Sequence, residues 1–333
     1  MNERISRKLS WLQLICAIMI IGLHTAFPSY FHITDARLLQ VNVFARNLYD
    51  AAISTFFFLS AYLLFRNAEQ RSYLQVLKRR FWSLAVPYVL WNAVFYAHAL
   101  VRESLTVGQA LTPPDVLTVI RKLTIAPANS IFWFLLTLGG LIVLFPVLRW
   151  AVRRKWPAWM AAILCAAAVY IPPLGAVYET MVYWLPVYLA GAYTAYWHRD
   201  RFERLPQLRR KWMYAAALAA WLALAWIRPL AAWAHYLYWL PAALLLWMLA
   251  DGLAARRPCP WWAGCSFYLY CCHMVVEHYA VEIYLRTLGT GVIPYLLSHI
   301  LLPCLCAAIA LAGAAVVRKL MPGVFRLFTG MRS

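Results

Sequence analysis

Charge is scarce in this sequence, and negative charge is the scarcest. Only 12 of the 333 residues are Asp or Glu, and charged residues make up 13% of the chain. A soluble domain usually carries about 25% charged residues, so this composition excludes an ordinary soluble protein. Hydrophobic residues make up 64% instead. Apolar runs of about 20 residues recur along the chain, and in lipid such runs must be helical because the backbone finds no other hydrogen-bond partners.

We therefore expect an all-α fold, a polytopic membrane bundle of about ten transmembrane helices that forms a single domain over residues 1–333. No long hydrophilic segment is attached at either end, and no internal repeat of fixed period is visible. The predicted spans cover residues 9–27, 48–65, 82–100, 131–149, 157–174, 180–197, 212–228, 234–250, 261–284 and 293–317.

Positive charge is plentiful and unevenly placed. With the N-terminus inside, 24 of the 31 Lys and Arg residues fall in cytoplasmic segments, as the positive-inside rule requires. An even number of spans then places both termini in the cytoplasm. This asymmetry explains the formal charge of +19 without a nucleic-acid partner. The first apolar run lacks a small-residue cleavage site, so we interpret it as a retained helix in the cytoplasmic membrane.

Metal-binding patterns are also missing. The chain has eight cysteines, but no CxxC pair, and most of them lie inside apolar runs. Structural zinc sites usually need paired cysteines or cysteines with nearby histidines. We therefore predict that the cysteines are small packing residues and that the protein holds no metal.

Two histidines interrupt the apolar runs at similar depth. At about 1.5 Å per residue, His24 lies roughly 22 Å above the inner edge of its span, and His273 lies about 18 Å above its own. Ionisable groups inside a membrane usually face a polar cavity, although each ring alone is equally suited to joining two helices by donating to a carbonyl group. Glu277 follows His273 by one helical turn, where it is placed to fix the tautomer of that ring or to lie at the outer surface.

A basic cluster precedes the third span. Positive-inside topology alone explains most of the charge in this loop. Lys78, Arg79 and Arg80 nevertheless stand together directly before a helix, and such a cluster also suits a phosphorylated ligand.

Motifs spread along the chain, in a fixed order, resemble those of acyltransferase family 3, the ten-helix integral-membrane O-acyltransferases. Each motif alone is weak, but together they cover nearly the whole chain. The matching segments are IMIIGLHTA with His24, STFFFLSAYLL with Phe57, Phe58, Ser60 and Tyr62, YLQVLKRRFWSLAVPYVLWN with Lys78, Arg79, Arg80, Pro87, Tyr88 and Trp91, SIFWFLLTL with Trp133, Phe134 and Leu135, and SFYLYCCH with Tyr270 and His273.

Four positions depart from the family pattern. Gln13 stands where an Arg often lies eleven residues before the first histidine, and Ala61 replaces a glycine. Ser83 and Leu136 each stand where the family often has an Arg. These departures are typical either of a divergent branch or of an impaired enzyme.

The resemblance implies an acyl-CoA co-substrate, most simply acetyl-CoA, supplied from the cytoplasm of a bacterium. Lys78, Arg79 and Arg80 would hold its phosphates, and the acceptor would be a hydroxyl of a cell-surface or lipid-linked carbohydrate. His24 would act as general base or carry the acyl group, and His273 would donate a hydrogen bond. Supporting positions would be Gln13, Ser60, Tyr62, Trp133, Tyr270 and Glu277. The alternatives are a transporter or flippase of a lipid-linked sugar, and a non-catalytic membrane partner.

Overall fold

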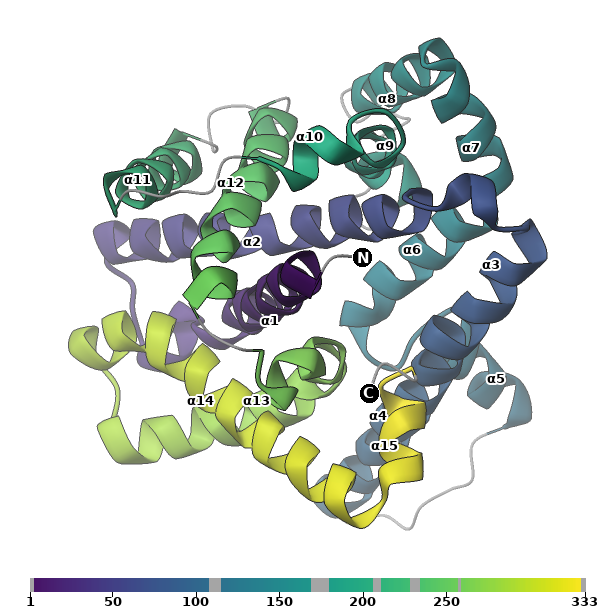
Figure 1. Cartoon of the computed structure of the whole chain (residues 1–333). Coiled ribbons are helices and arrows are strands. Elements are labelled where there is room, and N and C mark those ends of the chain that lie inside the picture. The colour runs from purple at the N-terminus through teal and green to yellow at the C-terminus, as the bar shows by residue number, and fades with distance from the viewer. Residues whose placement is uncertain are drawn as a thin grey trace.

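A computed structural model describes residues 3–107, 115–168, 180–205, 211–227, 234–256 and 259–330, and all regular secondary structure in these residues is helical (Figure 1). The longer helices are α1 (Glu3–Thr25), α2 (Ala36–Phe65), α4 (Val86–Val107), α9 (Met181–Trp197), α11 (Lys211–Ile227), α12 (Ala234–Arg256), α13 (Ser266–Leu288) and α14 (Val292–Leu320).

Shorter helices connect these. The α-helical ones are α3 (Tyr73–Arg80), α5 (Val116–Thr124), α6 (Trp133–Val143), α7 (Phe145–Arg154), α8 (Trp156–Ala168), α10 (Arg199–Glu203) and α15 (Pro322–Phe328). Single 3₁₀ turns form η1 (Pro28–Phe31), η2 (Ala68–Gln70), η4 (Ser130–Phe132) and η6 (Trp261–Cys265), and η3 (Phe81–Ala85) is a π-helical turn.

The expected all-α fold is confirmed, and every predicted span overlaps a helix, but the number of spans is not established. Among the described residues, five helices are long and apolar enough to cross a membrane, or six if one bent pair counts as a span. That pair corrects the sequence prediction, because the expected span 131–149 is broken near Leu144 and α6 and α7 meet at 65°. Residues 169–174 and 228 of two other predicted spans lie outside the described residues.

Two of the long helices contain a proline that does not end them. Helix α9 continues through Pro186, and α12 continues through Pro241. Many large apolar side chains face outward, with Leu105, Trp156 and Ile300 each at least 69% exposed. A surface of this kind is what a lipid-facing helix bundle presents.

Helix α1 occupies the centre of the bundle and packs against α2, α12, α13 and α14 (Figure 1). Its buried residues therefore lie all around its circumference rather than on one face. Gly22 makes the closest of these approaches possible, because a Cβ atom there would lie 2.6 Å from the ring of Tyr49 in α2.

Helices α2 and α9 also pack closely against each other. A Cβ atom on Gly191 would lie 2.2 Å from the carbonyl oxygen of Phe58, so the two backbones meet directly at this glycine. Stacked aromatic rings extend the contact, with Phe57 and Trp184 only 4.9 Å apart between ring centroids. Glycine at a helix crossing allows such close packing inside membranes.

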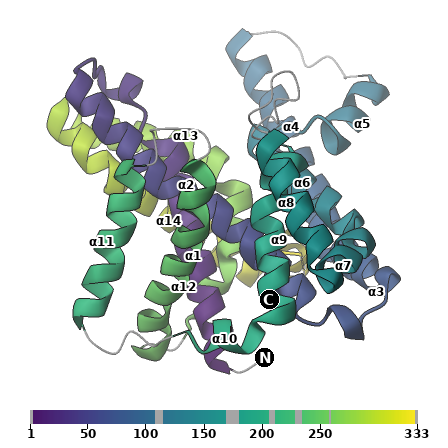
Figure 2. The ribbon, with the colours of Figure 1, turned by 90° about the horizontal axis from the view of Figure 1, so that it is seen from above.

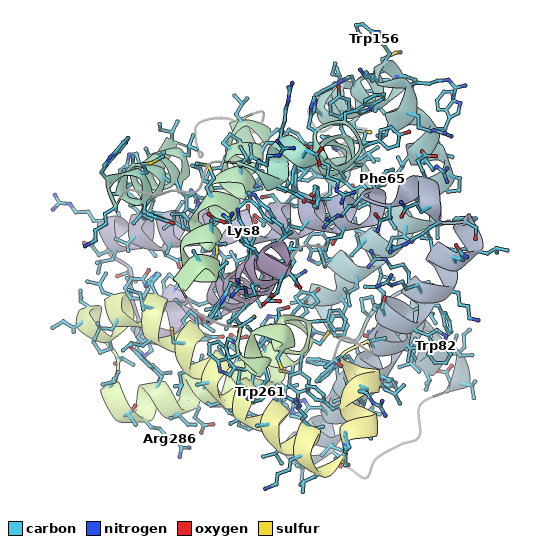
Figure 3. All side chains as sticks on the ribbon, viewed as in Figure 1. Lys8, Phe65, Trp82, Trp156, Trp261 and Arg286 are labelled. Carbon is cyan, nitrogen blue, oxygen red and sulfur yellow. The ribbon has the colours of Figure 1, made fainter. Side chains whose placement is uncertain are left out.

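Buried acidic residues hold several helix ends together. Asp251 of α12 accepts from Arg4 at 2.6 Å and lies 3.4 Å from the Nζ atom of Lys8. Lys8 is only 1% exposed, and Figure 3 labels it near the middle of the bundle beside α12. In Figure 2 the start of α1 and α10 lie at one edge of the molecule, and α5 lies at the opposite edge.

Helix α3 leads into α4 through the π-helical turn. Ser72 and Gln75 form a capping box that starts α3, which ends with Lys78, Arg79 and Arg80. The next five residues, Phe81–Ala85, form the wider π turn before α4 begins. Such turns are frequent at functional sites, and this one follows directly on the basic cluster.

Candidate active site

The two histidines that the sequence placed at similar depth are neighbours. The ring centroids of His24, in the last turn of α1, and His273, in α13, lie 5.5 Å apart with a tilt of 41°. His273 is fully buried, and His24 is half-buried. Packing of α1 against α13 thus joins two residues from opposite ends of the chain.

The tautomer of His273 is fixed by its own helix. Its Nδ1 atom lies 2.7 Å from the carbonyl oxygen of Tyr270, one turn earlier. Because a carbonyl oxygen only accepts, Nδ1 must carry the proton, and the neutral ring presents an unprotonated Nε2. That Nε2 atom is buried and has no hydrogen-bond partner among the residues that the structure describes. A buried polar atom without a partner is rare, and here it marks a position where a reacting group can be bound.

Glu277 does not do what we expected of it. The carboxyl group is buried, yet no hydrogen bond joins it to His273, whose ring is held by Tyr270 instead. The neighbouring group is Tyr30 of η1, whose pKa is raised by burial and by the nearby Glu277 carboxylate. Glu277 therefore lies one helical turn beyond His273, close to Tyr30, and does not hold the ring.

A cation that sequence reasoning missed lies beside His24. Arg46 of α2 donates from Nη1 to the carbonyl oxygen of Leu23, 2.6 Å away, and its guanidinium lies 5.5 Å from the ring of Phe27. The carbonyl of Leu23 is in the last turn of α1, where the helix offers no backbone partner. Arg46 had no signal in the sequence beyond being a charge near a predicted span.

The basic cluster opens into a cationic cavity of about 860 Å³, here called the mouth. Lys78, Arg79 and Arg80 all line it, and Arg199 of α10 joins them from a distant segment. Glu203 lies beside it and pairs with Arg66 at 3.0 Å and with Arg199 at 3.4 Å. The complete lining is Leu63, Arg66, Asn67, Arg71, Gln75, Lys78, Arg79, Arg80, Trp82, Ser83, Arg199 and Gly330.

A second cavity, of about 330 Å³ and here called the tunnel, adjoins the mouth, because Leu63 and Arg80 line both, and neither His24 nor His273 is among its lining residues. Arg80 lines both spaces and so stands where they meet. Tyr270 also lines the tunnel and lies one turn from His273, with 6.1 Å between the ring centroids. The lining residues are Ser10, Gln13, Phe56, Ser60, Leu63, Arg80, Leu84, Phe134, Leu135, Leu138, Gly264, Ser266, Phe267 and Tyr270.

A cationic mouth, an adjoining cavity and a pair of neighbouring imidazoles are suited to group transfer from a charged donor. The model of a protein family described as an acyltransferase domain matches residues 7–318. The chain belongs to this acyltransferase family. It is an enzyme of the class that transfers acyl groups other than aminoacyl groups, and its apolar helices and its family make it a membrane protein.

This acyltransferase is also similar to one curated protein along its entire length. It is 25% identical over 363 residues to the succinoglycan biosynthesis protein ExoH of Rhizobium meliloti (strain 1021), an alignment that covers 100% of this chain and 94% of that protein. No solved structure matches the chain.

The remaining site residues predicted for the acyltransferase divide into two groups. Gln13, Ser60 and Tyr270 line the tunnel. Tyr62 and Trp133 do not. The hydroxyl of Tyr62 donates to Glu203 at 2.7 Å, behind the mouth, and Trp133 packs on Trp184 within the α2–α9 aromatic cluster.

The departures from the family pattern fall in informative places. Gln13 lines the tunnel, so the position that often carries a cation is neutral there. Ser83 lines the mouth, and Ala61 is buried in α2. Leu136 lines a separate apolar groove on the outside of α6. The eight cysteines all lie in the described residues, where none forms a disulfide, and five of them are buried.

Proposed function

We propose that this acyltransferase moves an acyl group, most simply acetyl, from cytoplasmic acyl-CoA to a hydroxyl of a cell-surface or lipid-linked carbohydrate in the bacterial inner membrane. The observation that carries the proposal is that Arg80 lines both the cationic mouth and the tunnel, whose lining also includes Tyr270, one helical turn before His273. Similarity to a succinoglycan biosynthesis protein supports a polysaccharide acceptor.

The mouth suits the nucleotide end of CoA. Among the described residues, no ion pair engages Lys78, Arg79 or Arg80, and Glu203 is shared between Arg66 and Arg199. Phosphate groups would supply the missing negative charge through charge-assisted hydrogen bonds. The tunnel suits the thioester arm, since Ser10, Gln13 and Ser60 offer polar groups along a narrow path to amide groups of the donor.

Chemistry would take place at the imidazoles. His24 removes the proton from the acceptor hydroxyl while the hydroxyl oxygen attacks the thioester carbonyl carbon. The C–S bond of the thioester then breaks. The CoA thiolate leaves and takes up the proton from the His24 imidazolium. Neutral His273 offers Nε2 as an acceptor that orients the hydroxyl or an N–H of His24, and this replaces the donor role that we expected from the sequence. Transfer through an acyl-imidazole on His24 uses the same geometry in two half-reactions.

The test uses purified protein, radiolabelled acetyl-CoA and membrane glycans, and follows where the label goes. We expect labelled glycan with the wild-type chain and none with His24→Ala. His278→Ala is the matched control, because His278 lies exposed on α13. Glycan labelling by His24→Ala at the wild-type rate would remove His24 from the mechanism, and no labelling by any folded form would refute the proposed reaction.

A further inference from the structure

An apolar groove lies outside the tunnel, against the same helices. It has a volume of about 620 Å³ and runs between the α3–η3–α4 segment and α6. Its lining residues are Leu77, Lys78, Arg80, Phe81, Leu84, Ala85, Tyr88, Leu135, Leu136, Gly139, Gly140, Ile142 and Val143. Apart from the two cations and Tyr88, every lining residue is apolar. The groove shares Arg80, Leu84 and Leu135 with the tunnel, but it lacks the polar residues Ser10, Gln13 and Ser60 that line the tunnel.

The dimensions of the groove match one leaflet of a bilayer. Residues 77 to 88 rise about 16 Å along the helix axis. That length is about half of a hydrocarbon core roughly 30 Å thick. The groove is open at the surface, where Phe81 is 55% exposed and Val143 is 57% exposed. An extended acyl chain from one leaflet would therefore lie along it.

The charges lie at one end. Lys78 and Arg80 belong to the last turn of α3, at the end of the groove that the positive-inside rule places at the cytoplasm. No ion pair or hydrogen bond to either side chain occurs within the part of the chain that the structure describes. When no donor occupies the mouth, a neutral lipid would leave these cations without a counter-charge, whereas the phosphate of an anionic lipid would pair with them.

We propose that this groove, here called the lipid groove, binds one anionic phospholipid of the inner leaflet. One acyl chain lies between α4 and α6, and the headgroup phosphate is paired with Lys78 at the rim. The inference does not depend on the identity of the acyl donor. Because Lys78 also lines the mouth, the lipid phosphate would stand beside the entrance used by the donor.

Gly139 makes the lipid groove testable without touching the proposed donor site. A Cβ atom on Gly139 has no neighbour within 4 Å, so a larger side chain there would enter the open space of the groove. The adjacent Gly140 is unsuitable, because its Cβ atom would lie 2.2 Å from the Sδ atom of Met181. Gly313 of α14 provides the matched control, since its nearest neighbour is the Tyr268 hydroxyl at 4.0 Å.

The experiment places the full chain in phosphatidylcholine vesicles that contain a small amount of diazirine-labelled phosphatidylglycerol, followed by photolysis and peptide mapping. We expect labelling concentrated in residues 77–88 and 135–143, at least several-fold above that given by diazirine-labelled phosphatidylcholine. Gly139→Phe should reduce this labelling several-fold, and Gly313→Phe should leave it unchanged. Glycerol 3-phosphate, which has the phosphate without the chain, should not compete.

Three results would overturn the proposal. These are equal labelling by the two lipids, labelling spread evenly over α14, and unchanged labelling in Gly139→Phe. Should Gly139→Phe fail to fold, Leu136→Trp fills the same space from a side chain that is already 36% exposed. Acyl transfer is not measured, so failure here would not count against the proposed reaction, and failure of that reaction would not count against the lipid groove.

Discussion

Arg46 of α2 and Leu23 of α1 are joined by a hydrogen bond of 2.6 Å from Nη1 to the carbonyl oxygen. The bond satisfies a carbonyl at the end of α1 and fixes a positive charge one residue before His24. Arg46 therefore determines the position of the last turn that carries the proposed base, without itself standing in the reaction.

Replacement of Arg46 by Gln should lower kcat about tenfold, because a hydrogen bond from a charged donor is worth about 1.5–3 kcal/mol. The KM for acetyl-CoA should stay unchanged, since the mouth lies elsewhere. Arg46→Lys should recover part of the rate. Arg37→Gln, at an exposed position of the same helix, serves as the control. A KM that rises while kcat is preserved would contradict a positioning role.

Gly264 lines the tunnel, and a Cβ atom there has no neighbour within 4 Å. We expect Gly264→Leu to narrow the passage and to raise the KM for acetyl-CoA several-fold, with little loss of thermal stability. Steady-state kinetics on the purified protein measures the first effect, and thermal unfolding in detergent measures the second. Gly313→Leu introduces the same side chain outside the tunnel. If both variants had the wild-type KM, the donor would not pass along this wall.

Asp251 is the counter-charge of a cluster in which Lys8 is almost completely buried. Asp251→Asn should destabilise the protein by about 3–5 kcal/mol, because it leaves the Lys8 ammonium group uncompensated. Lys8→Met should cost much less, since Arg4 still neutralises Asp251 at 2.6 Å. The measurement is the midpoint of thermal unfolding in detergent for each variant. Equal losses in the two variants would contradict this asymmetry.

The sequence predicted the parts of the site that follow from hydropathy, from the rise of a helix per residue and from clusters of charge. Hydropathy identified the helices, and the rise per residue placed His24 and His273 at the same level, where the structure brings their rings together. The basic cluster was visible as three consecutive basic residues, Lys78, Arg79 and Arg80. Residues that depend on how helices pack could not be predicted in this way. Arg199 joins the mouth only because α10 lies beside the end of α2. The bend near Leu144 has a local signal, because Pro146 lies in the first turn of α7, but hydropathy alone does not show it.

The role of Glu277 shows the same limit. Spacing along one helix suggested that its carboxylate would hold the ring of His273. The backbone carbonyl of Tyr270 does so instead, at 2.7 Å. Main-chain groups are present at every position, so a sequence does not reveal which of them a side chain will use.

The central place of α1 has a consequence for biogenesis. A ribosome releases this helix first, yet three of the four helices that enclose it, α12, α13 and α14, are synthesised last. During most of translation, His24 therefore has no finished pocket to occupy, and the nascent chain is inert. A product shortened before residue 273 would keep the mouth-forming segment of α3 but would lack His273, so under the proposed mechanism the activity arises only when the last helices are inserted.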